Sequence, residues 1–234
     1  ALICSSHSGT PAHRARALAL LERGGFTAAD LLCGAHRPLG EATARAEERA
    51  DQGQGACWSA LHNNCSGKHA GMLLACRRLG LDPADYIDPQ HPLQQRIAAE
   101  LGEVVSAGAP VQPCGIDGCS APTFAMPLAA LAHGFARLAD PGASGLDIAR
   151  AGAPGRLGAT MAAHPEMVAG PGRFTTAPIA ATAGRAATCS VSRPSTTPWR
   201  PALRWNCRRR GRFPTRAWSP CTPRWATRSG TSAS

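Results

Sequence analysis

The chain of 234 residues contains a single lysine, Lys68, while its other basic side chains, apart from histidine, are arginines. Arginine can supply a positive charge, so a lysine that remains is expected to supply a compact amine that can lose its proton. Lys68 lies in residues 62–72, HNNCSGKHAGM, the densest run of reactive side chains in the sequence. We interpret it as a candidate base, nucleophile or metal ligand. The alternative is chance survival on a solvated helix face.

Several protein classes are excluded by other absences. No apolar run approaches the roughly 18 residues of a membrane span. No basic segment precedes an apolar run at the start, so we expect no secretory signal. The ten cysteines include no Cys-x-x-Cys pair, and we expect reduced thiols in a cytoplasmic protein, most of them small core residues. The chain opens on Ala1 without an initiator methionine, which predicts that it begins partway through a longer protein.

Acidic residues are missing from the last part of the chain. The net charge of +10 arises entirely in residues 186–234, which carry ten arginines and no acid, whereas residues 1–185 are neutral. The charge therefore describes a tail and not a domain. The tail holds four of the five tryptophans and has no helical or strand period. We predict a core at 1–185 and an irregular, disordered tail at 186–234, and we hypothesise that the reading frame shifted near residue 186.

Local signals predict a mostly helical chain with some strands. Thr10 caps a helix that has Pro11 in its first position, and glycines at 24 and 25 end it. Further helices are predicted at residues 41–50, from the lysine motif to Gly80, at 93–101, after Pro127 and near 157–163. The helix after Pro127 carries four apolar residues at helical spacing: Leu128, Leu131, Phe135 and Leu138. Strands are predicted at 1–5 and 111–116.

Cys65 and Lys68 are spaced by one helical turn, so a thiolate and an amine can meet on one helix face. Near the positive end of the helix dipole, the neutral form of the amine is favoured. The amine could act as the base for a nearby nucleophile. Alternatively, both groups could bind one metal ion with the distant Cys119 as third ligand, which is a catalytic zinc pattern. From spacing alone, buried free thiols remain the simplest interpretation of both cysteines.

Polar residues around these positions are candidates for binding a ligand. Asp117 follows the predicted strand at 111–116, and it could receive an ammonium group or simply form a turn. Asn63 and Asn64 are two of the three asparagines in the chain, and they could bind a polar ligand or cap the loop. His62 and His69 flank the loop, and either could orient a substrate.

Taken together, four segments resemble the asparaginase II family, the thermolabile, rhizobial-type L-asparaginases. They are residues 6–9 (SHSG), 62–72, 117–128 (DGCSAPTFAMPL) and 167–174 (MVAGPGRF), in the order of the family. The resemblance implies hydrolysis of L-asparagine to aspartate and ammonia. It also implies an α/β fold similar to serine β-lactamases and penicillin-binding proteins, a central antiparallel sheet with helices, which would be incomplete in this chain.

The resemblance also implies roles for particular residues. Zinc, in a structural or substrate-positioning role, would be bound by Cys65, Lys68 and Cys119. Around the substrate, L-asparagine, would lie Asn63, His69 and Asp117. Ser8 matches the serine of a second Ser-Lys pair and is the candidate catalytic residue, with Ser6 close by. Intact family members are expected to form homodimers, and no membrane partner or specific nucleic acid is expected.

The chain departs from the family at both ends. The family's nucleophile lies in a Ser-x-x-Lys motif that would precede Ala1, and a further lysine expected toward the C-terminus is absent. Loss of a nucleophile and its base should cost several orders of magnitude in rate, so we expect little or no activity. Two alternatives remain open: a nucleic-acid-binding protein that uses the basic tail, and a β-lactamase-like hydrolase of another amide. Glutamine is the nearest rival substrate.

Overall fold

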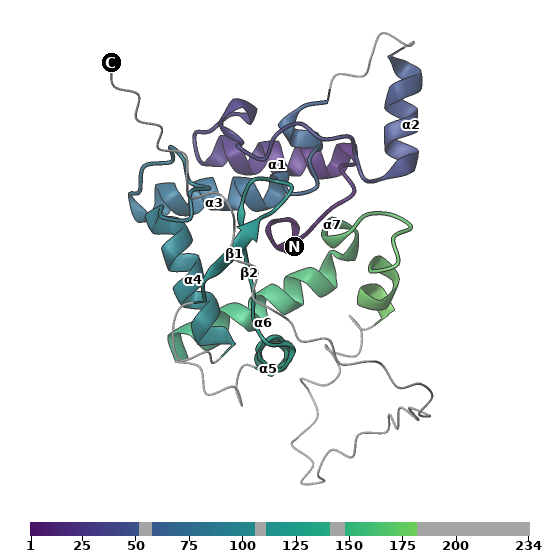
Figure 1. The fold of residues 1–234 in the computed structure, drawn as a ribbon. Helices are drawn as coiled ribbons and strands as arrows, with labels where there is room; N and C mark the ends of the chain where they lie inside the picture. The colour runs from purple at the N-terminus through teal and green to yellow at the C-terminus, as the bar shows by residue number, and fades with distance from the viewer. Residues whose placement is uncertain (52–57, 106–110, 141–147, 182–234) are drawn as a thin grey trace, which may run out of the picture. The chain divides into compact units, whose positions relative to one another are not determined.

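The computed structural model describes residues 1–51, 58–105, 111–140 and 148–181, all within one unit, Ala1–Arg193. The predicted tail at 186–234 lies outside the described residues, and its disorder stays a prediction. The described part is mostly helical and includes one small antiparallel sheet (Figure 1). None of its helices is both long and apolar enough to span a bilayer.

Helix α1, Pro11–Arg23, begins and ends as predicted. The Thr10 hydroxyl accepts a hydrogen bond from the amide of His13, and the chain leaves the helix at Gly24. Helix α2, Glu41–Ala50, also has the predicted bounds. Helix α3, Ser66–Leu79, ends at Gly80, whose φ of 67° is easily adopted only by glycine. Capping residues thus mark both ends of α1 and the end of α3, whereas α2 and α3 begin without a side-chain cap.

The main core forms where α1 packs against α3 (Figure 1). Its fully buried members include Leu21 from α1, Leu73 and Cys76 from α3, and Tyr86 from the following loop. Burying a side chain of the size of leucine stabilises the fold by roughly 1.5–3 kcal/mol. The start of α3, which carries the lysine motif, is therefore anchored on a packed core.

The predicted strand at residues 1–5 is wrong. Leu2–Cys4 forms a 3-10 turn, and the Ser5 hydroxyl donates to the Leu2 carbonyl at 2.6 Å. Leu2 is buried against α3 at Gly67, where an added Cβ would lie 2.8 Å from the Leu2 carbonyl oxygen. A short apolar run fits a strand or a helical turn equally well. Here it packs on a helix, and among the described residues no strand pairs with it.

The sheet consists of β1, Pro113–Ile116, and β2, Pro122–Phe124, with Gly115 paired to Thr123 and Ile116 paired to Pro122. The strand predicted at 111–116 is thus confirmed over its last four residues. In the tight turn between the strands, Ser120 has a φ of 69°, and the Ser120 amide donates to the Asp117 carbonyl at 2.9 Å. The hairpin carries this turn to the start of α3 (Figure 1). The central sheet expected from the family resemblance amounts to these two strands within the described residues.

The remaining helices are α4, Pro92–Val104, α5, Leu128–Ala139, α6, Ile148–Ala163, and α7, Pro165–Val168. Two further 3-10 turns lie at Ala28–Asp30 and Ala60–His62. Helix α5 follows Pro127 as predicted, but its apolar residues are largely exposed, with Leu128 at 79% and Phe135 at 63%. The helix instead approaches a second, smaller buried cluster at Gly134, where an added Cβ would lie 3.2 Å from Val105.

Candidate metal and substrate site

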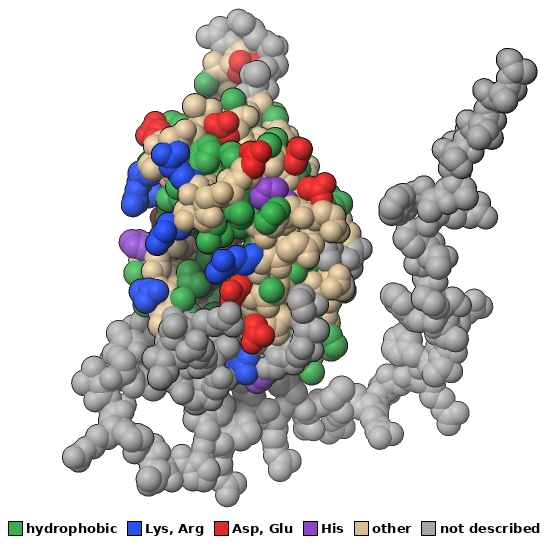
Figure 2. Space-filling view, turned by 90° about the vertical axis from the view of Figure 1, so that its left-hand side faces the viewer, with side chains coloured by type: hydrophobic (Ala, Val, Ile, Leu, Met, Phe, Trp, Pro, Cys, Tyr) green, Lys and Arg blue, Asp and Glu red, His purple; other side chains and the backbone are tan. Residues whose placement is uncertain are grey.

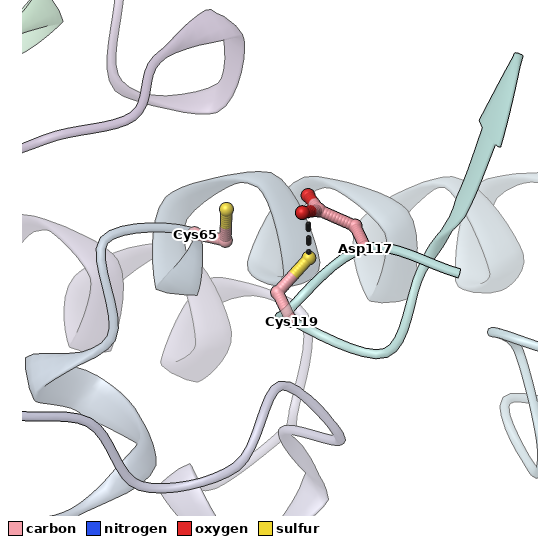
Figure 3. Close-up of side chains that lie close together, drawn as sticks. All are labelled: Cys65, Asp117 and Cys119. Carbon is pink, nitrogen blue, oxygen red and sulfur yellow. Dashed lines mark hydrogen bonds between the residues drawn. The ribbon is translucent and has the colours of Figure 1, made fainter. Parts of the chain in front are cut away.

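The hairpin turn and the start of α3 bring together two cysteines and an aspartate. Cys65 immediately precedes α3, while Asp117 and Cys119 lie in the turn between β1 and β2 (Figure 3). The Cys65 sulfur, the Cys119 sulfur and an Asp117 carboxylate oxygen all lie within 4.8 Å of one another. Both cysteines are buried, whereas Asp117 is exposed. A ligand could therefore reach the site from the side of Asp117.

Lys68 completes this cluster from the first turn of α3. Its Nζ atom lies 3.2 Å from Cys119 Sγ and 3.5 Å from Asp117 Oδ2. The Cys119 sulfur lies 3.3 Å from the same carboxylate oxygen. The structure thus brings the three predicted zinc ligands, Cys65, Lys68 and Cys119, into one place, and it adds Asp117, which the sequence had suggested for substrate binding.

Charge within the cluster is unevenly distributed. A hydrogen bond between the two thiols raises the pKa of Cys65 and lowers the pKa of Cys119, so Cys119 is the more acidic of the pair and favours the thiolate. Burial alone would lower the pKa of Lys68, but the Cys119 thiolate and the Asp117 carboxylate outweigh burial and raise it. The expected neutral amine is therefore wrong for this arrangement. The effect of the helix dipole is smaller than that of two anions in direct contact.

Asn63 fixes the loop that carries Cys65. Its Oδ1 atom accepts from the Cys65 amide at 2.8 Å, and its Nδ2 atom donates to the carbonyl oxygens of Cys33 and Gly34 at 2.8 and 3.2 Å. Asn63 is only 2% exposed. Its amide is thus engaged within the chain, which gives it a local structural role, and the substrate contact assigned to it stays a prediction.

Ser8, the candidate catalytic residue, is buried beside another part of the chain. Its hydroxyl donates to the Ala169 carbonyl at 2.7 Å. Gly170 adopts a φ of 127°, and a Cβ there would come within 2.7 Å of the Ser8 Cβ. Within the described residues, no hydrogen bond is seen from Ser8 to Cys65, Lys68 or Cys119. Its catalytic role stays a prediction.

The neighbouring serine lies closer to the cysteine cluster. Asn64 Nδ2 donates to the exposed Ser6 hydroxyl at 2.7 Å and also lies 3.5 Å from Cys65 Sγ. Of the two serines in the SHSG segment, Ser6 is therefore the one connected to the cluster through a single side chain. His62, which flanks the motif, lies apart from His69 and pairs with Glu47 at 3.4 Å.

Two contacts between side chains of the motif and distant residues escaped the sequence interpretation. His69 is fully buried, and its Nδ1 atom lies 2.7 Å from the hydroxyl of Tyr86. Tyr86 is the only tyrosine in the chain, so the scarcity argument applied to Lys68 would have singled it out. The second contact joins His7 Nε2 to the Ser66 hydroxyl at 3.1 Å. No local pattern links these two residues, which are 59 positions apart.

Comparison with known proteins identifies the family of the chain. The model of the L-asparaginase II family matches residues 1–189, which include every segment of the cluster. None of the curated proteins compared with the chain matches it. The family match covers most of the 234 residues, and so the chain belongs to the L-asparaginase II family.

Proposed function

We propose that this chain derives from an amidohydrolase that converts L-asparagine to aspartate and ammonia. The observation that carries the proposal is the convergence of Cys65, Lys68, Asp117 and Cys119 in a chain of the L-asparaginase II family. These side chains supply a thiolate, an amine and an exposed carboxylate in one place. Glutamine, one methylene longer, is the rival substrate, and discrimination by one methylene is worth about 1–3 kcal/mol.

The donor set fits zinc. Cys65, Lys68 and Cys119 offer two sulfurs and one nitrogen, and Asp117 adds an oxygen nearby. The lowered pKa of Cys119 favours the thiolate that a metal requires. Cys65 and Lys68 would release protons on binding, so affinity should depend on pH. When bound, zinc would supply a fixed positive charge that holds the start of α3 against the hairpin turn.

In the proposed site, Asp117 receives the ammonium group of the amino-acid substrate. Its side chain is 45% exposed, and its Oδ2 atom already attracts the Lys68 ammonium at 3.5 Å. His69, at the buried side of Cys119, orients the substrate, and Asn63 keeps the loop in place. Ser8 is the proposed catalytic hydroxyl, and it would have to exchange its bond to Ala169 for one to substrate.

The activity of this chain alone should be weak or absent. The residue three positions before the only lysine is Cys65, so the sequence contains no Ser-x-x-Lys motif to supply the nucleophile. We propose that the complete fold resembles serine β-lactamases and penicillin-binding proteins, with a larger antiparallel sheet, and that intact relatives form homodimers in the cytoplasm. The family match ends at residue 189, and we propose that an aberrant, frame-shifted segment begins at about residue 186.

Ammonia release and metal content test the proposal together. The purified 234-residue chain should bind about one zinc ion per molecule by elemental analysis, and it should release ammonia from L-asparagine slowly or not at all. Restoring the flanking coding sequence in frame should raise the rate by several orders of magnitude. If the restored protein hydrolyses another amide and leaves L-asparagine and L-glutamine intact, the related alternative of a β-lactamase-like hydrolase replaces this proposal.

Nucleic-acid binding is the second candidate because all the excess charge lies in residues 186–234. On the face drawn in Figure 2, acidic and basic side chains of the described residues are interspersed. This face of the described residues therefore offers no basic groove. Deleting residues 186–234 should abolish any salt-dependent binding to duplex DNA, whereas binding that survives the deletion would place the contact elsewhere.

A further inference from the structure

The hydroxyl of Tyr86 occupies a fully buried position between two nitrogen atoms. It lies 3.0 Å from the Leu32 amide, which donates to it, and 2.7 Å from His69 Nδ1. Burial raises the pKa of Tyr86, so the hydroxyl keeps its proton. A phenol buried this completely is retained only where its hydroxyl is well bonded.

The number of protons in this contact determines the tautomer of His69. A tyrosine hydroxyl has one proton to donate and lone pairs to accept. The Leu32 amide can only donate, so it takes up a lone pair of the hydroxyl. If His69 Nδ1 also donated, the Tyr86 proton would be buried without an acceptor, which costs about 1–3 kcal/mol. Tyr86 therefore donates to Nδ1, and the ring carries its own proton on Nε2.

The Nε2 atom of His69 is the unusual part of this arrangement. It is buried and makes no hydrogen bond of ordinary geometry with the described residues. The ring nevertheless lies close enough to Cys119 that, after Cys65 and despite burial, it helps to lower the pKa of that thiol. A buried N–H group without a regular partner is uncommon in folded proteins. His69 directly follows Lys68 of the cysteine cluster in α3, so this unpartnered donor belongs to the neighbourhood of the site.

We propose that Tyr86 is a positioning residue, which holds His69 in the Nε2–H tautomer and thereby directs a hydrogen-bond donor at Cys119 and the substrate beside it. The inference rests on the proposed function, in which His69 borders the amino-acid substrate. The acceptor in the proposed complex is an oxygen atom of the amide or carboxylate of the bound substrate, whereas in the free protein Nε2 has no regular hydrogen-bond partner among the described residues. Tyr86 itself does not touch the substrate.

Histidine tautomers can be measured directly by long-range imidazole ¹H–¹⁵N NMR on the full chain. A His69→Gln variant assigns the His69 signal. His91 is an internal reference, because its Nδ1 atom accepts from the Leu93 amide at 3.1 Å and its Nε2 atom lies 2.9 Å from the Asp82 carbonyl. We expect His69 to be protonated on Nε2 alone, as His91 is. In Tyr86→Phe, His69 should become a mixture of both tautomers while His91 stays unchanged.

Either of two results would overturn the proposal: His69 protonated on Nδ1 in the unaltered chain, or the Nε2–H tautomer fully retained in a folded Tyr86→Phe protein. If that variant does not fold, the spectrum of the unaltered chain still decides the first of these. A merely structural Tyr86, packed edge-to-face on His69 with ring centres 5.5 Å apart, would leave the tautomer unchanged. Failure of the protein with restored flanking sequence to hydrolyse asparagine counts against the proposed function and leaves the tautomer result intact.

Discussion

Two clusters of reactive side chains meet at the start of α3, where Cys65 belongs to one and Ser66 to the other. They differ in charge and in access to solvent. The cysteine cluster of Cys65, Lys68, Asp117 and Cys119 contains ions and includes an exposed carboxylate. The histidine cluster of His7, Ser8, His13 and Ser66 is buried, and burial, followed by repulsion from His13, lowers the pKa of His7 to about 3.

The difference follows from the partners of each cluster. In the histidine cluster, backbone carbonyls of the segment around α7 accept from the side chains, with His13 Nε2 at 2.8 Å from Glu166 and Ser8 bonded to Ala169. These hydrogen bonds from His13 and Ser8 join the N-terminal part of the chain to the segment around α7, and we call them the lock. Both donors are neutral and satisfied. The cysteine cluster pairs unlike charges instead, and such pairs can exchange partners with a ligand. The histidine cluster thus joins two parts of the chain through neutral hydrogen bonds, whereas the cysteine cluster is the proposed binding site.

Removing a ligand from the cysteine cluster should have the largest effect. In Cys119→Ser, the thiolate that favours metal binding is lost, and zinc affinity should fall by more than about 100-fold, measured by competition with a chromogenic chelator. The matched control is Cys4→Ser, at an exposed cysteine outside the cluster, which should keep its zinc. Equal zinc binding by the two variants would break the assignment of this cluster to metal.

The lock should be most sensitive at Gly170. In Gly170→Ala, the new methyl group collides with Ser8, and the φ of 127° becomes strained. The free energy of unfolding should fall by about 2–4 kcal/mol in urea titrations. Gly172→Ala is the control, because its φ is 69° but nothing lies within 4 Å, so the loss should be only about 1–2 kcal/mol. If the two losses were equal, close packing against Ser8 would not matter.

Acid should weaken the lock through His7. Its pKa is about 3 in the folded chain against 6.5 for the ordinary value, so between these limits the unfolded chain binds the extra proton. Its contribution to stability is present above pH 6.5 and is lost as the pH falls toward 3, by up to about 1.4 kcal/mol per pH unit. His7→Asn should reduce this slope in unfolding titrations, whereas His36→Asn, at an exposed histidine, should retain it. An unchanged slope in His7→Asn would assign the acid sensitivity to other groups.

The smallest effect on stability is expected for Lys68→Arg. This variant tests whether the Lys68 amine acts only as a positive charge or also as a metal ligand. Arginine keeps the attraction to Asp117, so the free energy of unfolding should change by no more than about 0.5 kcal/mol. Arginine does not lose its proton, so zinc should bind about 10-fold more weakly or worse. Zinc binding equal to that of the unaltered chain would show that the amine is a charge partner and not a ligand.

Local signals predicted the helices more reliably than the strands. Thr10, Pro11 and Gly80 mark helix ends because each satisfies a backbone requirement within a few residues. Residues 1–5 were predicted wrongly as a strand, because a short apolar run carries no information about whether a helix or a strand will cover it. The apolar stripe of α5 was found, but its exposure depends on packing that helical spacing does not encode.

The sequence by itself determined where α1, α2 and α3 begin or end, the family of the chain, and which rare residues carry the chemistry, with Lys68 foremost. Only the tertiary structure brought Cys119 to Lys68 across 51 positions and added Asp117 to the pair. It also decided that the Lys68 amine is charged, because its pKa depends on anions that the fold places in contact with it. The contact between Tyr86 and His69 has the same origin, since hydrogen bonds between distant side chains arise only when a shared core buries both.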